Sequence, residues 1–204
     1  ACNAANKVFT SFSESEKENV KQQYTQGADY FFYTGAIHPR KNVDQLIKAF
    51  DLFKAQTGAS AKLLIAGRMA WQVSAVEEAY NRAKYKEDIQ LLGYVAQEAL
   101  TGLMASAKCF CYLSRHEGFG IPLLEAMQSE VPIICSNVSS LPEVAGDAAL
   151  LVAPGDVAGT AAAMQQMWKD ESLQQHLIKK GRRRLQHYSW ERAATVVDAL
   201  LRSV

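Results

Sequence analysis

Short apolar runs alternate along the chain with stretches of helical periodicity, and this alternation restricts the fold more than any other feature. Six runs rich in β-branched, aromatic and aliphatic residues are predicted strands: 30–34, 62–66, 89–93, 109–114, 131–136 and 149–152. Several of them are apolar on both faces, as expected for parallel strands that helices cover above and below. Because parallel strands are joined by crossovers that are usually helical, we predict an α/β fold with a doubly wound, mostly parallel six-stranded sheet.

Helical periods occupy the segments around these predicted strands. In 42–53 the apolar residues repeat at the i, i+3, i+4, i+7 spacing of one helix face, and 96–107 repeats the pattern more weakly. Ser13 and Glu16 stand at capping-box spacing ahead of a polar helix, 14–24. After residue 156 the predicted elements are helices only, over 157–168, 173–187 and from about Ser189 onward. The sheet is therefore expected to end in a helical C-terminal tail.

The composition narrows the classes of function. Lys and Arg number 22 against 21 for Asp and Glu, and this balance argues against a nucleic-acid binder, which usually carries a strong basic excess. No run approaches the roughly 18 apolar residues of a membrane span, and the opening residues lack a signal-peptide core. The cysteines Cys2, Cys109, Cys111 and Cys135 lack metal-ligand spacing and are expected to be reduced, mostly buried thiols. We expect a cytoplasmic protein without a metal site or nucleic-acid partner.

The loop after the first predicted strand carries two adjacent cations, Arg40 and Lys41, just before a helix begins. Ligands of open α/β sheets bind outside the carboxyl ends of the strands, so this loop lies where a ligand is expected. Cations beside the N–H groups of a helix start form an anion site, most plausibly for phosphate. A solvated basic turn is the alternative interpretation.

The loop after the fourth predicted strand combines glycines with two carboxylates. Gly118 and Gly120 allow a backbone to approach a ligand closely, and Pro122 suits the first turn of a helix. Glu117 and Glu125 flank this helix start, and ionised carboxylates accept hydrogen bonds from sugar hydroxyls. The alternatives are a capping role for Glu117 and a surface helix position for Glu125.

Residues 117–127, Glu-Gly-Phe-Gly-Ile-Pro-Leu-Leu-Glu-Ala-Met, resemble the E-x7-E signature of retaining glycosyltransferases of the GT-B type, particularly glycosyltransferase family 4. Further blocks resemble those of the family in the same order: 39–42, 64–67, 92–95, 139–146 and 189–191. The resemblance covers roughly residues 30 to 200. It implies a Rossmann-like domain that forms the C-terminal half of a GT-B fold and transfers a sugar with retention of configuration.

The resemblance implies a role for each motif residue. Arg40 and Lys41 would hold the diphosphate of a nucleoside-diphosphate sugar, and Glu125 would bind the ribose hydroxyls. Glu117 would lie at the donor sugar, facing the anomeric carbon, as the catalytic residue. The remaining donor-binding residues implied are Gly35, Gly93, Tyr94, Val95, Gly118, Phe119, Gly120 and Ile121. Among these, the 119–121 amides would contact sugar and phosphate, and the 93–95 turn would flank the base.

The resemblance also implies how the chain is organised and what it works with. Residues 30–204 would be the nucleotide-sugar binding domain, and 1–29 a polar lead-in or interdomain segment. The N-terminal acceptor domain of the family is expected to be absent from these 204 residues, so the chain alone would bind donor and transfer little. The acceptor would be a glycan, lipid or other molecule, and the full-length enzyme would be cytoplasmic or peripheral to a membrane. The sequence has no Asp-x-Asp pair, so no metal is expected. No cofactor is expected either, and the nucleoside-diphosphate sugar would be a substrate.

Other interpretations remain open. The chain could be a non-catalytic nucleotide-binding or interaction module that kept the fold. A nicotinamide-dependent dehydrogenase is disfavoured, because no Gly-x-Gly-x-x-Gly follows the first predicted strand. A basic cluster lies on a predicted C-terminal helix, and we interpret it as a solvated helix face rather than as a patch for nucleic acid or membrane. It comprises Lys179, Lys180, Arg182, Arg183 and Arg184.

Overall fold

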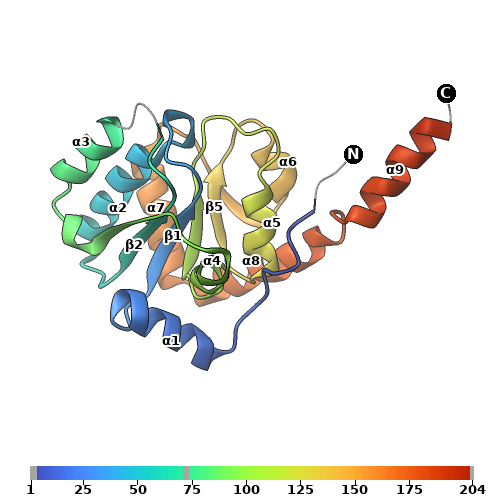
Figure 1. The fold of residues 1–204 in the computed structure, drawn as a ribbon. Coiled ribbons are helices and arrows are strands. Elements are labelled where there is room, and N and C mark those ends of the chain that lie inside the picture. The colour runs from blue at the N-terminus through green and yellow to red at the C-terminus, as the bar shows by residue number, and fades with distance from the viewer. Residues whose placement is uncertain (1–3, 71–73, 203–204) are drawn as a thin grey trace.

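The structure is a computed structural model that describes residues 4–70 and 74–202. Within these residues six strands form one sheet in the order β3-β2-β1-β4-β5-β6, and every neighbouring pair is parallel (Figure 1). The strands are β1 (Tyr30–Thr34), β2 (Lys62–Ala66), β3 (Ile89–Gly93), β4 (Cys109–Tyr112), β5 (Ile133–Ser136) and β6 (Ala149–Val152). The predicted doubly wound α/β sheet is confirmed.

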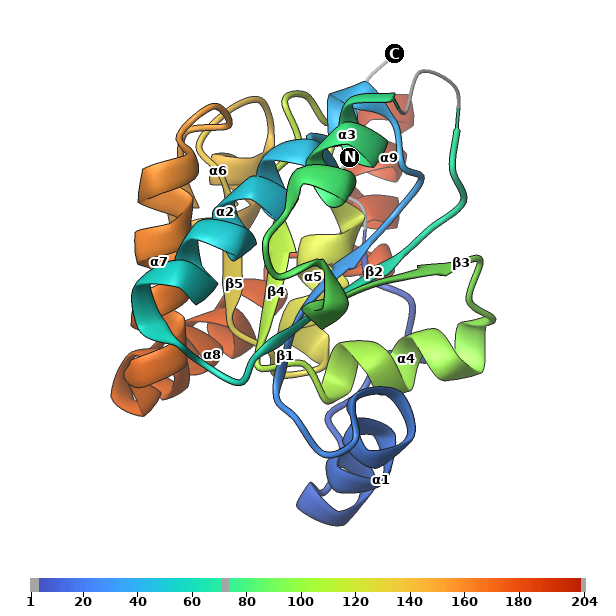
Figure 2. The same cartoon turned by 90° about the vertical axis from the view of Figure 1, so that its left-hand side faces the viewer.

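Helices cover both faces of this sheet. The described helices are α1 (Glu14–Thr25), α2 (Val43–Thr57), α3 (Ser74–Arg82), α4 (Gln97–Ala105), α5 (Ile121–Gln128), α6 (Leu141–Ala145), α7 (Val157–Lys169), α8 (Glu171–Leu185) and α9 (Trp190–Arg202), with short 3₁₀ helices η1 (Pro39–Lys41) and η2 (Lys86–Asp88). Helices α3, α2 and α7 line one face, and α4, α5 and α6 cover the other (Figures 1 and 2). Helix α8 packs on α5, and α9 projects away from the body (Figure 1). None of the described helices is long and apolar enough to cross a membrane.

Most predicted elements are confirmed, with boundaries shifted by local chemistry. The strand predicted over 131–136 begins at Ile133, because Pro132 has no N–H to donate to the ladder. The strand predicted over 109–114 ends at Tyr112. The next carbonyl, of Leu113, accepts a hydrogen bond from the Asn42 side chain. The helix predicted over 42–53 continues to Thr57 and ends at Gly58 in the left-handed region, at φ 63°. Helices α3 and α6 were not among the predicted elements.

Aromatic side chains join β1 to the helices behind it. Phe31 of β1 contacts Phe50 and Phe53 of α2 and Trp168 of α7, with ring centroids between 5.3 and 6.3 Å apart. The three phenylalanines are fully buried, and burial of each such side chain stabilises the fold by roughly 1.5–3 kcal/mol. This cluster holds the β1 end of the sheet against α2, the helix that begins directly after the first cationic loop.

The segment ahead of residue 30 packs on the domain. The predicted capping box is confirmed: the Ser13 hydroxyl accepts from the Glu16 N–H at 3.4 Å, and the Glu16 carboxylate accepts from the Ser13 N–H at 2.8 Å. Helix α1 lies against α4, and Phe9 is buried in the main core. The described part of 1–29 therefore packs directly against the rest of the domain.

The basic cluster on α8 is used largely within the domain. Arg182 forms a two-pronged ion pair with Glu130, with nitrogen–oxygen distances of 2.7 and 2.6 Å. Lys180 lies 3.1 Å from Asp147, and Arg184 donates to the Val144 carbonyl at 3.1 Å. Three of the five cations thus bind residues that precede β5 or lie between β5 and β6. These side chains remain on the surface, so the contacts add local partners to the predicted solvated face.

Main-chain hydrogen bonds continue past the ends of β1, β2 and β3. The Gly35 N–H donates to the Ala66 carbonyl at 3.0 Å, and the Gly67 N–H donates to the Gly93 carbonyl at 2.7 Å. The Ile37 N–H then donates to the Arg68 carbonyl at 2.9 Å. A side chain at position 67 would overlap the backbone of Gly35, so only glycine allows the loops to approach this closely. The three loops at this edge of the sheet consequently form one bonded unit.

We expect Gly67→Ala to lower the free energy of unfolding by about 2–3 kcal/mol, because the added Cβ forces the β1 and β2 loops apart. Gly155→Ala is the matched control, since a Cβ there meets no atom within 4 Å. It should change the free energy of unfolding by less than about 0.5 kcal/mol. Urea denaturation followed by circular dichroism measures both, and equal losses would contradict the close approach.

Candidate functional site

The candidate site lies where the carboxyl ends of β1 and β4 meet. Strand order reverses between these neighbours, and such a switch point is where open α/β sheets bind ligands. The loop after β1 contributes Arg40 and Lys41 from η1, and the loop after β4 contributes Glu117. The Arg115 N–H donates to the Arg40 carbonyl at 2.8 Å, so the two loops are joined through their backbones.

Glu117 forms ion pairs with both cations. Its Oε1 lies 2.6 Å from Lys41 Nζ, and its Oε2 lies 3.0 Å from an Arg40 guanidinium nitrogen. Lys41 Nζ also donates to the Tyr112 hydroxyl at 2.7 Å. The Glu117 side chain is 9% exposed and that of Lys41 is 11% exposed, whereas Arg40 is 43% exposed. The structure thus brings together groups that the sequence placed in two separate loops.

The charges of this cluster are mutually dependent. Burial alone would raise the pKa of Glu117, but the hydrogen bond from Lys41 and the positive charge of Lys41 outweigh burial and hold the pKa below its ordinary value. Burial also raises the pKa of Tyr112, and the neighbouring Glu117 carboxylate adds to the rise. Glu117 is therefore a carboxylate at neutral pH, and Tyr112 a neutral phenol that can donate or accept.

Asn42 fixes the position of the cations. It is fully buried in the left-handed region, at φ 60°, between η1 and α2. Its side-chain amide donates to the Leu113 carbonyl at 3.0 Å and to the Pro154 carbonyl at 2.6 Å. One side chain therefore ties the loop after β1 to the loops after β4 and β6. No role was predicted for Asn42 from the sequence, although the hydrogen-bonding capacity of asparagine and its tolerance of positive φ favour it in such a turn.

Two serines on the loop after β5 hold the backbone of Glu117. The Ser139 hydroxyl donates to the Glu117 carbonyl at 2.6 Å and accepts from the Glu117 N–H at 3.2 Å. The Ser140 hydroxyl lies 3.0 Å from the Glu117 carbonyl and 2.8 Å from the Phe119 carbonyl. These serines lie in one of the blocks used for the resemblance, but their supporting role was not predicted.

The start of α5 presents backbone donors beside this cluster. The helix begins at Ile121 after Gly120, whose φ is 103°, and Pro122 occupies its first turn as predicted. Within the described part of the chain, the amide N–H groups of residues 118–121 donate to no protein acceptor. A Cβ at Gly120 would approach Leu141, so glycine is favoured by both space and φ. These amides are available to an anion or to sugar hydroxyls.

Glu125 lies apart from the ion-paired cluster. It lines a cavity of about 530 Å³ between α5, residues 4–7 and Trp190. No donor among residues 4–70 and 74–202 hydrogen bonds to its carboxyl group. Burial raises the pKa of Glu125 to about 7. The structure therefore leaves its carboxyl free to meet a ligand, but does not bring it into contact with Glu117.

Two cavities at this edge of the sheet share Ala36, and several of the predicted residues line them. One, of about 310 Å³, includes Gly35, Tyr94 and Val95. The other, of about 300 Å³, includes Arg40 and Lys41. Gly93 lies at the end of β3, with φ 66°, and its carbonyl accepts from Gly67. Phe119 is half-buried and its ring packs edge-on against that of Tyr188.

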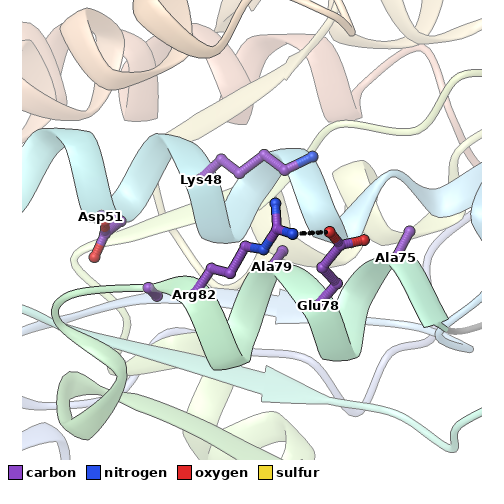
Figure 3. A pocket seen from close by; sticks show the side chains of 7 residues that line it. Lys48, Asp51, Ala75, Glu78, Ala79 and Arg82 are labelled. Atoms are coloured by element: carbon purple, nitrogen blue, oxygen red, sulfur yellow. Dashed lines mark ion pairs between the residues drawn. The ribbon is translucent and has the colours of Figure 1, made fainter.

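A further groove, between α2 and α3, is separate from this edge of the sheet (Figure 3). Lys48 and Asp51 of α2 face Glu78 and Arg82 of α3 across it, and Arg82 forms an ion pair with Glu78 at 2.9 Å. It contains none of the residues of the candidate site.

Metal-ligating side chains are not clustered in the described ranges, where no group of three or more His, Cys, Asp or Glu residues is arranged to hold a metal ion. Cys109, Cys111 and Cys135 are free and buried in β4 and β5. Cys2 lies outside the described residues. His38 accepts from the Arg40 N–H at 3.1 Å and thereby caps η1.

Comparison with known proteins adds to this geometry. A family model described as "Glycosyl transferases group 1" matches residues 14–184. The O-antigen chain mannosyltransferase B of Escherichia coli is 39% identical over 166 residues, which cover 81% of this chain and 44% of that protein. The chain thus spans less than half the length of this relative.

Solved structures show the same fold. Sucrose-phosphate synthase from Thermosynechococcus elongatus superposes with a TM-score of 0.84 at 24% identity, over 99% of this chain and 51% of that chain. HepE of Anabaena, crystallised with UDP and glucose, superposes with a TM-score of 0.87 at 18% identity, over 99% and 56% of the two chains. At these identities the superpositions establish the architecture alone.

We expect Glu125→Gln to raise the free energy of unfolding at pH 8 and to leave it unchanged near pH 4. Burial raises the pKa of Glu125 from 4.5 to about 7 in the folded protein, so the folded state retains a proton that the unfolded chain releases. Stability therefore falls as pH rises between these two values, and a neutral glutamine removes the effect. Denaturation curves at pH 4, 6 and 8 measure the difference. The exposed Glu98→Gln is the control, and a pH-independent gain for Glu125→Gln would contradict the assignment.

Proposed function

The chain belongs to the glycosyl transferases group 1 family, and from this premise we propose that it is the part of a glycosyltransferase that binds the nucleoside-diphosphate sugar. In its architecture it corresponds to the C-terminal domain of a GT-B glycosyltransferase. The observation that carries the proposal is the cluster of Arg40, Lys41 and Glu117 at the switch point of the sheet.

The two cations and the α5 amides supply the positive charge for a diphosphate. When the bond to the anomeric carbon breaks, negative charge develops on the departing diphosphate. Donors already fixed around it stabilise that charge more in the transition state than in the ground state. Lys41 is held by Tyr112 and Glu117, so its ammonium group is positioned before the ligand arrives. In this proposal the protein itself supplies the charge, and donor binding is expected to be the same in Mg²⁺ and in EDTA.

Glu117 is proposed to accept hydrogen bonds from the donor sugar beside the anomeric carbon. Its low pKa keeps it ionised, and Ser139 and Ser140 hold its backbone in place. Glu125 is proposed to bind the ribose hydroxyls, and its unbonded carboxyl in a cavity supports that role. Retention of configuration is proposed from the resemblance of 117–125 to the E-x7-E signature.

The sugar and the acceptor are proposed from the relatives. Because the Escherichia coli relative is named a mannosyltransferase, we propose mannose as the transferred sugar. This chain covers 44% of that relative, and we propose that the acceptor, a glycan or a lipid-linked glycan, is bound by the remainder of a longer protein.

Lys41→Met should weaken the binding of nucleoside diphosphates about 10-fold or more, because it removes a charged hydrogen-bond donor from the diphosphate. Isothermal titration calorimetry with UDP, GDP and ADP and their glucose and mannose derivatives measures the effect. Lys48→Met is the matched control. Lys48 lies in α2, outside the candidate site, and its ion pair is local, with Asp44 one helical turn away at 3.1 Å. Unchanged affinity for every ligand after Lys41→Met would disprove the site assignment.

Glu117→Gln should strengthen the binding of nucleoside diphosphates and reduce the additional affinity that the sugar of a sugar nucleotide contributes. A nucleoside diphosphate should bind several-fold more tightly, because the carboxylate no longer competes with phosphate for Lys41 and Arg40. The extra affinity contributed by an attached sugar should fall by about 10-fold, because the sugar loses a charged acceptor. The same calorimetric panel gives both values. If the affinities for diphosphate and sugar nucleotide change in the same proportion, Glu117 does not contact the sugar.

A further inference from the structure

Tyr112 places a phenol hydroxyl beside the cations of the candidate site. It is the last residue of β4 and is 1% exposed. Its ring stacks on the rings of Phe110 and Tyr33, with centroids 5.7 and 6.3 Å apart and interplanar angles of 22° and 20°. Because packed aromatic rings on buried strands hold one rotamer, the hydroxyl oxygen of Tyr112 has a defined position at the end of the strand.

This hydroxyl is one of two partners of the Lys41 ammonium group. Lys41 Nζ donates to the Tyr112 oxygen at 2.7 Å and to Glu117 Oε1 at 2.6 Å. An ammonium group carries three N–H donors. Among residues 4–70 and 74–202, no third acceptor lies within hydrogen-bond distance of this nitrogen. Two N–H bonds are therefore directed at protein atoms, and one is left for a ligand.

The two protein partners together determine where the third N–H bond points. The bonds around an ammonium nitrogen are tetrahedral, so fixing two of the N–H directions fixes the third. With Glu117 as the single partner, the ammonium group could pivot about one hydrogen bond at the end of a flexible four-carbon side chain. Lys41 is 11% exposed and lines the cavity of about 300 Å³ that also contains Arg40, and a ligand reaches the ammonium group from there.

We propose that Tyr112 is a positioning residue for donor binding, which directs the free N–H bond of Lys41 at the diphosphate; this inference rests on the proposed function. The two partners of Lys41 differ in charge. A diphosphate competes with the Glu117 carboxylate for the ammonium group, but the Tyr112 hydroxyl is neutral and forms a weaker hydrogen bond that an anion gains little by replacing. Tyr112 therefore keeps Lys41 in place while Glu117 turns to the sugar.

Tyr112→Phe removes the hydroxyl and keeps the stacked ring. It should weaken the binding of a nucleoside diphosphate about 5-fold, as expected for one lost hydrogen bond. Isothermal titration calorimetry of the whole 204-residue chain measures the effect, with whichever of UDP, GDP and ADP the unsubstituted chain binds most tightly.

A double-mutant cycle with Lys41→Met separates positioning from general support of the fold. If Tyr112 acts through Lys41, Tyr112→Phe should change the affinity by less than about 1.5-fold once residue 41 is methionine, because no ammonium group is left to orient. A merely structural role would instead give the same loss of affinity with lysine and with methionine at position 41.

Tyr30→Phe is the matched control. Tyr30 is also a fully buried tyrosine, its hydroxyl donates to the Leu103 carbonyl at 2.8 Å, and it lies at the end of β1 away from the candidate site. It should leave the affinity unchanged, and circular dichroism should show that every variant folds.

Three results would overturn this inference and leave the proposed function intact: an unchanged affinity after Tyr112→Phe, equal losses in the two Lys41 backgrounds, or a similar loss for Tyr30→Phe. If no nucleoside diphosphate binds to the unsubstituted chain, the proposed function fails together with it.

Discussion

The amide of Asn42 is the contact on which the geometry of the site depends. It is fully buried and joins the carbonyls of Leu113 and Pro154, which belong to loops far apart in the sequence. Because Asn42 directly follows Lys41 and immediately precedes α2, these two hydrogen bonds hold η1 against the end of β4. A buried amide that lost such partners would leave polar groups unsatisfied, so the arrangement has few alternatives.

The ion-paired cluster is a balance of opposing terms. Burying Glu117 is costly, and two cations and two serine hydroxyls offset that cost through its side chain and backbone. In this state the cations are already assembled but partly neutralised. Any anion that binds these cations must therefore compete with Glu117, whereas under the proposed function a sugar nucleotide would also offer Glu117 new hydrogen-bond donors. Under the proposed function, this competition would disfavour free phosphate relative to a sugar nucleotide.

The strands and the two halves of the site could be predicted from the sequence, because apolar periodicity and the Gly, Pro and charge pattern of the loops are local signals. Contacts that depend on long-range register could not. Tyr112 reaches Lys41 only because β4 ends beside β1. Ser139 reaches Glu117 from the loop after β5, where Ser139 itself adopts the left-handed region at φ 59°. The cavity around Glu125 likewise depends on how residues 4–7 and Trp190 fold back on α5.

The main-chain bonds that extend β1, β2 and β3 into their loops have a consequence for evolution. Gly35, Gly67 and Gly93 shape the rim through backbone hydrogen bonds, whereas the side chains of Arg68 and Tyr94 on this rim are exposed. Positions such as 68 and 94 can then be exchanged without refolding the edge of the sheet. Single substitutions can thus change the surface of this rim while the backbone beneath it stays the same, which is the property that a variable surface on a constant scaffold requires.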